Sequence, residues 1–316
     1  MSDRIVDSPG HDGIDRRGFL ECMAWAGAGM VWAVSGGILT SRALGTAPAQ
    51  EKKGDFSFVQ ISDSHIGFAK PPNKDVVGTL KRAVAKIKAL ETKPDVLIHT
   101  GDLTHLSKPA EFDTVAEVLK EAKVGQTFFV PGEHDIFTDD GKLYLERHGK
   151  GTKGLGWHSY THKGCRFIGL VNVANLKPGG LGTLGKEQLD WLKKDVANLG
   201  DSTPIVVYAH VPLWTVYEKW GWGTDDAAQA LALLKRFGSV TVLNGHVHQT
   251  MKKVEGKVTF HTACSTAFPQ PAPGKADSPE PIKGVAADKL RGVLGITRVN
   301  YVESKSSLAI IDSSLE

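Results

Sequence analysis

Acidic residues and histidines occur in five short clusters along the chain, and side chains of both kinds can bind metal ions. In chain order the clusters are Asp63-Ser64-His65, Gly101-Asp102, Gly132-Glu133-His134-Asp135, His210 and Gly245-His246-Val247-His248. Carboxylates and neutral imidazoles are the ligands that suit zinc, iron and manganese, so this pattern predicts a metal centre. Its seven predicted ligands are Asp63, His65, Asp102, Glu133, His210, His246 and His248.

Each cluster comes directly after a segment with the length and apolar composition of a β-strand. These segments are residues 56–61, 95–99, 127–130, 204–209 and 240–243, and further strands are predicted at residues 166–171, 258–261 and 308–311. Residues 75–90 and 111–122 carry apolar side chains at helical spacing. Strands that alternate with helices predict an α/β domain, and ligands of open α/β sheets gather at the carboxyl ends of the strands.

The five clusters, in this order, resemble those of calcineurin-like metallophosphoesterases, whose pattern is DxH, GD, GNH followed by D or E, a lone H, and GHxH. The resemblance covers residues 56–311. It implies an α/β fold of four layers, an αββα sandwich, in which two mixed β-sheets lie face to face, helices flank them, and the ligands lie on loops at one rim. It also implies a hydrolase of phosphate mono- or diesters that takes a small phosphoester as its substrate.

The resemblance implies two metal ions bridged by Asp102, because a carboxylate has two oxygens and can span two cations. The implied ligands of the first metal are Asp63, His65 and His248. Those of the second are His210, His246 and the residue at position 133. Two cations about 3.5–4 Å apart can hold a shared hydroxide and stabilise an in-line displacement at phosphorus. Iron with zinc, or manganese, is expected, since these ions share the ligand preferences of the set.

His134 adjoins the metal-binding position and resembles the family histidine that contacts the phosphoryl oxygen or protonates the leaving alkoxide. We expect Asp135 to orient His134, as carboxylates orient imidazoles in other acid–base pairs; the alternative is that Asp135 is a turn residue. His105 lies near enough to Asp102 in sequence to reach the same cleft. The alternatives for His105 are a surface position or a hydrogen bond to a ligand.

Glu133 stands where the family has asparagine, and it changes the charge of the predicted site. Two divalent ions, one hydroxide, Asp63 and Asp102 sum to about one positive charge, whereas an ionised Glu133 brings the sum to about zero. Three hypotheses follow: one metal is trivalent, such as Fe(III) beside Zn(II); the substrate is a diester; or the site binds metal but hydrolyses slowly. The third describes a metal-binding or redox-associated protein on a phosphoesterase scaffold. A further alternative is that Glu133 turns away from the site.

The first 49 residues differ from the rest of the chain. Arg16-Arg17 precedes an apolar, Ala/Gly-rich stretch that ends near Leu39, and Ala47-Pro48-Ala49 supplies small residues for cleavage after Ala49. This pattern predicts a twin-arginine signal peptide at residues 1–49, a metallophosphoesterase domain at residues 50–316, and a periplasmic or secreted protein. The alternative is an uncleaved membrane anchor.

Composition adds limits to these expectations. The 316 residues carry a formal net charge of only +3, which is far from the basic footprint of a dedicated nucleic-acid binder. We therefore expect neither a nucleic-acid partner nor, after signal cleavage, a membrane partner. Cys165 and Cys264 either form a disulfide in an exported protein or remain buried thiols.

Substrate specificity is expected in three loops, at residues 70–74, 214–224 and 269–281. The second loop contains the aromatic residues Trp214, Tyr217, Trp220 and Trp222. These either form a wall beside the second metal or simply pack the loop onto the sandwich.

Overall fold

The computed structural model describes residues 30–35, 38–43, 55–177, 179–303, 305 and 308–316. The chain divides into two compact units, Met1–Gln50 and Glu51–Glu316. In the first unit, β1 (Met30–Ser35) and β2 (Ile38–Ala43) pair antiparallel. The paired arginines and the predicted cleavage site lie outside the described residues. Among the described helices, none has both the length and the apolar character needed to span a membrane.

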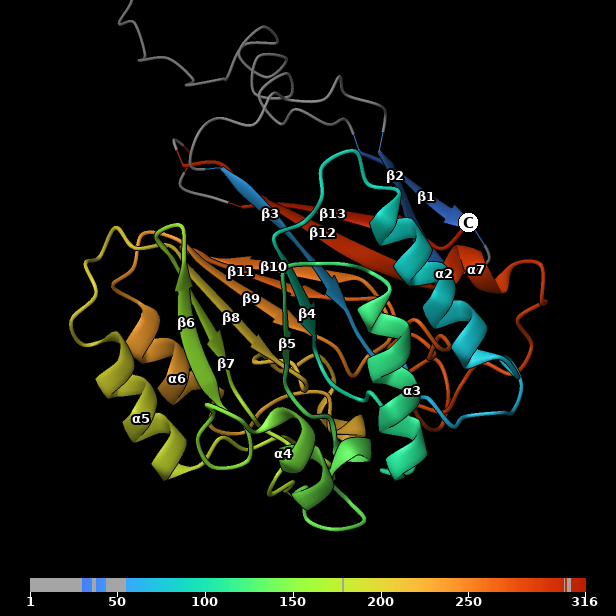
Figure 1. Ribbon diagram of the computed structural model, residues 1–316, viewed down its shortest axis with the longest axis horizontal. Helices are drawn as coiled ribbons and strands as arrows, with labels where there is room; N and C mark the ends of the chain where they lie inside the picture. The colour runs from blue at the N-terminus through green and yellow to red at the C-terminus, as the bar shows by residue number, and fades with distance from the viewer. Residues whose placement is uncertain (1–29, 36–37, 44–54, 178, 304, 306–307) are drawn as a thin grey trace, which may run out of the picture. The chain divides into compact units, whose positions relative to one another are not determined.

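The second unit contains two mixed sheets (Figure 1). The five-stranded sheet has the order β13-β12-β3-β4-β5, in which β3, β4 and β5 are parallel and β12 is antiparallel to both neighbours. Its strands are β3 (Phe56–Ile61), β4 (Val96–His99), β5 (Gln126–Phe129), β12 (Gly295–Tyr301) and β13 (Ala309–Ser314). The strands of this sheet that precede predicted ligands therefore run in one direction.

The six-stranded sheet has the order β10-β11-β9-β8-β7-β6, with four parallel inner strands and an antiparallel strand at each edge. Its strands are β6 (His158–His162), β7 (Cys165–Gly169), β8 (Ile205–Ala209), β9 (Val240–Asn244), β10 (Met251–Glu255) and β11 (Val258–Thr262). The two strands that lead to predicted histidine ligands, β8 and β9, are neighbours in its centre.

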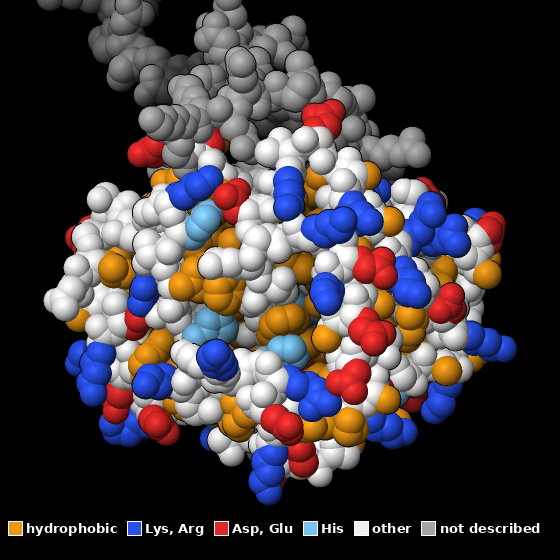
Figure 2. All heavy atoms as spheres, in the orientation of Figure 1, with side chains coloured by type: hydrophobic (Ala, Val, Ile, Leu, Met, Phe, Trp, Pro, Cys, Tyr) orange, Lys and Arg blue, Asp and Glu red, His pale blue; other side chains and the backbone are white. Residues whose placement is uncertain are grey.

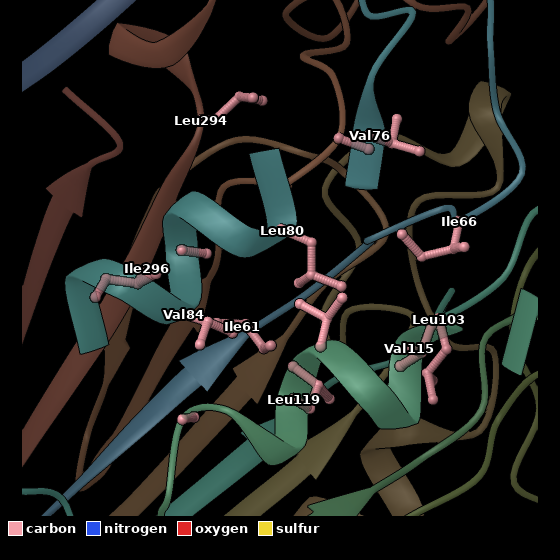
Figure 3. Close-up of a cluster of buried hydrophobic side chains, with 14 of the residues drawn as sticks. Ile61, Ile66, Val76, Leu80, Val84, Leu103, Val115, Leu119, Leu294 and Ile296 are labelled. Carbon is pink, nitrogen blue, oxygen red and sulfur yellow. The ribbon is translucent and has the colours of Figure 1, made fainter. Parts of the chain in front are cut away.

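Helices cover the outer face of each sheet (Figure 1). The five-stranded sheet is covered by α2 (Val76–Lys88) and α3 (Pro109–Lys120), and the six-stranded sheet by α5 (Lys186–Val196) and α6 (Ala227–Leu234). The shorter elements are α4 (Lys142–His148), α7 (Leu290–Val293) and the 3-10 turns η1 (Glu133–Asp135) and η2 (Glu218–Trp220). Figure 3 shows Leu80 of α2 and Val115 of α3 in one buried cluster with Ile61 of β3.

The sheets pack on each other through a second apolar layer, which β3 illustrates. Phe56 and Phe58 face the core between the sheets, whereas Val59 and Ile61 face the helices. Side chains of a strand point alternately to opposite faces, so a strand buried on both faces is mostly apolar; in β3 the buried polar exceptions are Ser57 and Gln60. The predicted α/β fold, a four-layer αββα sandwich of two mixed sheets flanked by helices, is thereby confirmed.

Both Cys165, in the core between the sheets, and Cys264 are free thiols.

Candidate metal centre

The seven predicted ligands lie in the loops that follow β3, β4, β5, β8 and β9. The loops after β3 and β4 are joined by backbone hydrogen bonds: the Asp63 N–H donates to Gly101 O (3.0 Å), and the His65 N–H to Asp102 O (2.9 Å). Five of the seven ligands adopt left-handed backbone conformations, which are uncommon outside glycine and gather at functional sites. They are Asp63, His65, Asp102, His246 and His248, with φ between 42° and 68°.

Asp63, His65 and His248 bring one donor atom each within 4.8 Å of one another, and we call them the first cluster. The His248 Nε2 lies 3.3 Å from Asp63 Oδ1 and 3.2 Å from His65 Nε2. The opposite ring nitrogen, His248 Nδ1, donates to the Phe268 carbonyl oxygen (2.6 Å). Because a carbonyl oxygen only accepts, His248 Nδ1 carries the proton and Nε2 of the neutral ring turns its lone pair into the cluster.

Glu133, His210 and His246 form the second cluster by the same distance criterion. Glu133 Oε2 lies 3.1 Å from His210 Nε2, and Glu133 Oε1 lies 3.1 Å from His246 Nδ1. The alternative that Glu133 turns away is therefore wrong. His210 Nδ1 donates to the Thr100 carbonyl oxygen (2.7 Å), so its Nε2 also presents a lone pair.

One buried atom of the second cluster supports a shared cation. Glu133 Oε2 is inaccessible to solvent and makes no hydrogen bond of acceptable geometry to any described residue, although His210 Nε2 is 3.1 Å away. Two lone-pair atoms that approach without a proton between them need a cation to offset their repulsion.

Asp102 lies between the clusters. Its Oδ2 is 3.4 Å from His65 Nε2 in the first cluster and 3.5 Å from His210 Nε2 in the second. Its Oδ1 accepts a hydrogen bond from the backbone N–H of His134 (3.0 Å). The position fits the bridging role that the resemblance implies for Asp102.

The surroundings favour the ionised forms of both cluster carboxylates. Burial opposes ionisation of Asp63, but the adjacent His248, His210 and Ser62 together outweigh it and lower the pKa of Asp63 to about 2. Against the same effect of burial, His246 holds the pKa of Glu133 well below its usual range. Burial lowers the pKa of the His65 ring well below its usual range. Burial lowers the pKa of His210, but Asp102 and Glu133 outweigh it and raise that pKa well above its usual range, so a cation bound by His210 takes the place of a proton. Ionised carboxylates and neutral imidazoles are the forms that bind metal ions, and the donor set fits two cations in those forms.

Asp135 does not orient His134, contrary to the prediction from the sequence. Its buried carboxylate accepts hydrogen bonds from the N–H groups of Gly132 (2.9 Å), Leu103 (3.1 Å) and Thr104 (2.9 Å), and from the Thr104 hydroxyl (2.9 Å). These bonds occupy the carboxylate and join the loop after β4 to the loop after β5. Asp135 therefore stabilises the backbone that carries Asp102 and Glu133, and among the described residues its hydrogen bonds do not include one to the imidazole of His134.

His134 is instead oriented by His105. Its Nδ1 donates to the His105 carbonyl oxygen (2.8 Å), and its Nε2 has no hydrogen-bond partner among the described residues. The ring of His134 packs edge-on against that of His65, with centroids 4.8 Å apart. A fixed imidazole with one free nitrogen beside the clusters can contact a bound phosphoryl group or transfer a proton.

His105 contacts two residues of the site, and its position in the sequence alone does not predict these contacts. Its Nδ1 lies 3.5 Å from His65 Nδ1, and its ring stacks on that of His134 with centroids 4.9 Å apart and planes 17° apart. Of the two alternatives, contact with a ligand is correct. The sequence feature that could have placed His105 in the site is its position three residues after Asp102, in the loop at the carboxyl end of β4.

A cavity of about 530 Å³ opens onto the clusters. His65, Asp102, Glu133, His134 and His246 contribute to its wall. The remaining lining residues come from two of the three predicted specificity loops and their surroundings: Phe68, Lys70, Pro71, His105, Phe268, Gln270, Pro279, Glu280, Pro281 and Lys283.

The aromatic loop at residues 214–224 does not line this cavity. Trp222 is fully buried and packs edge-on against Trp220 (5.0 Å between centroids), while Trp214 packs on Phe260. The alternative of simple packing onto the sandwich is therefore correct.

On the molecular face in Figure 2, Lys and Arg side chains lie scattered among Asp and Glu.

Comparison with known proteins places the chain in a family. Residues 56–250 match the family described as Calcineurin-like phosphoesterase. The chain is 25% identical over 222 residues (67% of this chain, 79% of the relative) to a 3',5'-cyclic-nucleotide phosphodiesterase of Nostoc sp.. It is 27% identical over 221 residues (66% and 77%) to a probable glycerophosphodiester phosphodiesterase of Arcobacter nitrofigilis.

The fold is also similar to that of a dimetal phosphatase from Danio rerio. The TM-score is 0.64 at 13% identity, and the match covers 83% of this chain and 96% of the other. This likeness agrees with the two sheets described above. The chain belongs to the calcineurin-like phosphoesterase family of phosphoester hydrolases.

Proposed function

We propose that this protein is an exported phosphodiesterase with two metal ions that hydrolyses small phosphodiesters. The observation that carries the proposal is the inward position of Glu133, which adds a negative charge to the second cluster. With two divalent ions, an attacking hydroxide and three carboxylates, the site sums to about zero charge. A diester brings one negative charge and a monoester up to two, so a site of low positive charge favours the diester.

Relatives support the same substrate class. The two relatives compared above are named as phosphodiesterases of cyclic nucleotides and of glycerophosphodiesters. The cavity of about 530 Å³ lies within the usual range of about 300–1,000 Å³ for small-molecule sites. Phe68 and Phe268 give it an apolar wall beside the first cluster, and Lys70 adds a positive charge.

Each group at the site has a role in this proposal. When bound, the two cations supply Lewis acidity at the phosphoryl group and acidify the attacking water. The first cluster, the second cluster and Asp102 hold them in place. Burial opposes protonation of His134, but Asp102 and Glu133 outweigh it and raise the pKa of His134, so the ring can carry a proton on each nitrogen. Its Nδ1–H stays on the His105 carbonyl oxygen, and its Nε2–H passes to the leaving alkoxide, which leaves a neutral ring.

Hydrolysis of paired substrates tests the substrate class. We expect kcat/KM for bis(4-nitrophenyl) phosphate to exceed that for 4-nitrophenyl phosphate by at least about tenfold, equivalent to about 1.4 kcal/mol. Metals are counted in the same sample. A preference for the monoester contradicts the diester proposal. Absence of both activities with two metals bound instead favours the metal-binding scaffold.

The metal content is the second part of the proposal. We propose iron with zinc, or manganese, because the imidazole and carboxylate ligands of the two clusters suit these ions. A metal-edge fluorescence scan on protein folded in its own host identifies them. Compared with two divalent ions, Fe(III) beside Zn(II) adds one positive charge to the site. Hydrolysis of monoesters relative to diesters would then be faster than the diester proposal expects.

Export is the third part. It is supported by Arg16-Arg17, the apolar stretch after them and the small residues before Gln50. We expect fractionated cells to contain a periplasmic form that starts at Gln50. Joint replacement of Arg16 and Arg17 by lysine should leave the full-length chain in the cytoplasm. A full-length wild-type chain in the membrane fraction would favour the uncleaved anchor.

A further inference from the structure

Three imidazoles of the site, those of His65, His105 and His134, have donor atoms within 4.8 Å of one another. Two of them have roles in the proposed function, as a ligand and as a proton donor. The third, His105, is half-buried, lines the cavity and touches both of the others. Its role follows from the hydrogen bonds that connect the three rings.

The hydrogen-bond partner of His65 differs from those of the other histidine ligands. His210 and His248 use their outer ring nitrogens to donate to backbone carbonyl oxygens. His65 Nδ1 instead faces a second imidazole, His105 Nδ1, at 3.5 Å. A carbonyl partner ends the hydrogen-bond chain, whereas an imidazole partner has another nitrogen and continues it.

The tautomers of both rings follow from this contact. His65 Nε2 faces Asp102 Oδ2 (3.4 Å) and His248 Nε2 (3.2 Å), so a neutral His65 that binds a cation there carries its proton on Nδ1. That N–H can only donate, and the nitrogen it meets, His105 Nδ1, must accept. A neutral His105 therefore carries its proton on Nε2.

The Nε2–H of His105 is a donor without a hydrogen-bond partner among the described residues. The ring is held by stacking on His134 and by an edge-on contact with Phe68 (5.3 Å between centroids). We propose that His105 is a substrate-binding residue whose Nε2–H donates to a phosphodiester oxygen in the cavity, while its Nδ1 holds the first-cluster ligand His65. The substrate class in this inference rests on the proposed function.

Two near-isosteric variants separate the two halves of this role. In His105→Asn the side-chain oxygen replaces Nδ1 as the acceptor for His65, and nothing replaces the Nε2–H. In His105→Gln the amide nitrogen reaches the position of Nε2, and the acceptor beside His65 is lost. His105→Ala removes both groups. Diethyl phosphate, a small diester that reacts slowly, serves as the binding probe, and a chelator titration of the metal-loaded protein measures metal retention.

We expect His105→Asn to weaken diethyl phosphate binding about tenfold, as for loss of one hydrogen bond to a charged group, with the chelator midpoint unchanged. We expect His105→Gln to retain most of the diester affinity and to lose the first metal at about tenfold less chelator, as for loss of a ligand's hydrogen-bond partner. His105→Ala should show both effects.

The proposal is overturned if His105→Asn binds diethyl phosphate as tightly as the wild type, or if the wild type does not bind it. It is also overturned if His105→Ala leaves the chelator midpoint unchanged, because His105 would then not hold His65. His162→Asn, on β6 and outside the cavity lining, is the matched control, and equal effects there would show that the changes are not specific. Neither readout requires turnover, so a wild type that hydrolyses no diester overturns the proposed function and leaves this inference open to its own test.

Discussion

The first and second clusters are built from the same kinds of side chain, but they differ in their exposure to the cavity. In the first cluster the side chains of Asp63 and His248 are 0% and 1% exposed. In the second cluster those of Glu133 and His246 are 28% and 14% exposed, whereas that of His210 is 0% exposed. A substitution at a buried position requires further changes in the core that packs around it. A substitution at a position that faces a cavity can change the charge of the site without them. The departure from the family pattern lies in the second cluster.

The sheet topology accounts for the exposure of Glu133. Asp63 and His65 follow β3, which lies in the middle of its sheet and is buried on both faces, while Glu133 follows β5 at the edge. A central strand is fixed by neighbours on both sides. An edge strand has a neighbour on one side only, so the loop after it has more room for a longer side chain such as glutamate.

The largest expected effect comes from the buried cluster. Asp63→Asn removes an ionised ligand and should lower kcat/KM for a diester about a thousandfold, equivalent to about 4 kcal/mol. Metal analysis should find one ion per chain instead of two. Retention of two ions at full activity would show that the first cluster is not a metal site.

Metal removal tests whether exposure controls metal release. We expect a chelator to remove the ion of the second cluster first and that of the buried first cluster later, so that a form with one metal accumulates. At a metal concentration of about one hundred times Kd, each bound ion adds about 3 kcal/mol to the free energy of unfolding. Calorimetric unfolding should then show two decreases in Tm. Simultaneous release of both ions would contradict the distinction between the clusters.

A control for acid effects lies outside both clusters, in the ion pair between Asp312 of β13 and His261 of β11 (3.0 Å). Although burial opposes it, His261 lowers the pKa of Asp312 to about 2, from 3.8. A carboxyl group whose folded-state pKa is depressed stabilises the fold above its unfolded pKa, and this stability is lost as the pH falls from about 4 through about 2.

For Asp312 that contribution is on the order of 2 kcal/mol. Asp312→Asn should therefore reduce the dependence of Tm on pH between 4 and 2, with metal content at neutral pH unchanged. If the variant loses metal at neutral pH, the ion pair supports the site as well as the sheets, and it no longer serves as a control.

The smallest expected effect concerns the exposed cluster. Glu133→Asn restores the family residue and raises the charge of the site by about one unit. We expect the ratio of monoester to diester kcat/KM to rise about tenfold while two metals remain bound. A fall in both activities would indicate that Glu133 is required for the native reaction, and Glu133→Gln, which keeps the side-chain length, separates charge from size.

Much of the fold could be predicted because buried parallel strands are near-continuous apolar runs. Residues 56–61 and 204–209 predicted β3 and β8 to within one residue, and the burial of these strands on both faces explains the clear signal. The inner strand β12 (GITRVNY) was missed, since the partly exposed Arg298 and Asn300 interrupt its apolar residues. The edge strand β10 (MKKVE) was missed because its exposed face carries charged side chains.

The sequence by itself determined the types and order of the candidate metal-binding residues and their positions at strand ends, because both are local properties of the chain. Only the tertiary structure decided which side chains meet. The His246 N–H reaches the Asp63 carboxylate across 183 residues of sequence, at a contact set by the packing of two sheets. The inward position of Glu133, the backbone partners of Asp135 and the contact between His105 and His65 depend on the same packing, since spacing along a chain does not fix distances between loops that belong to different strands.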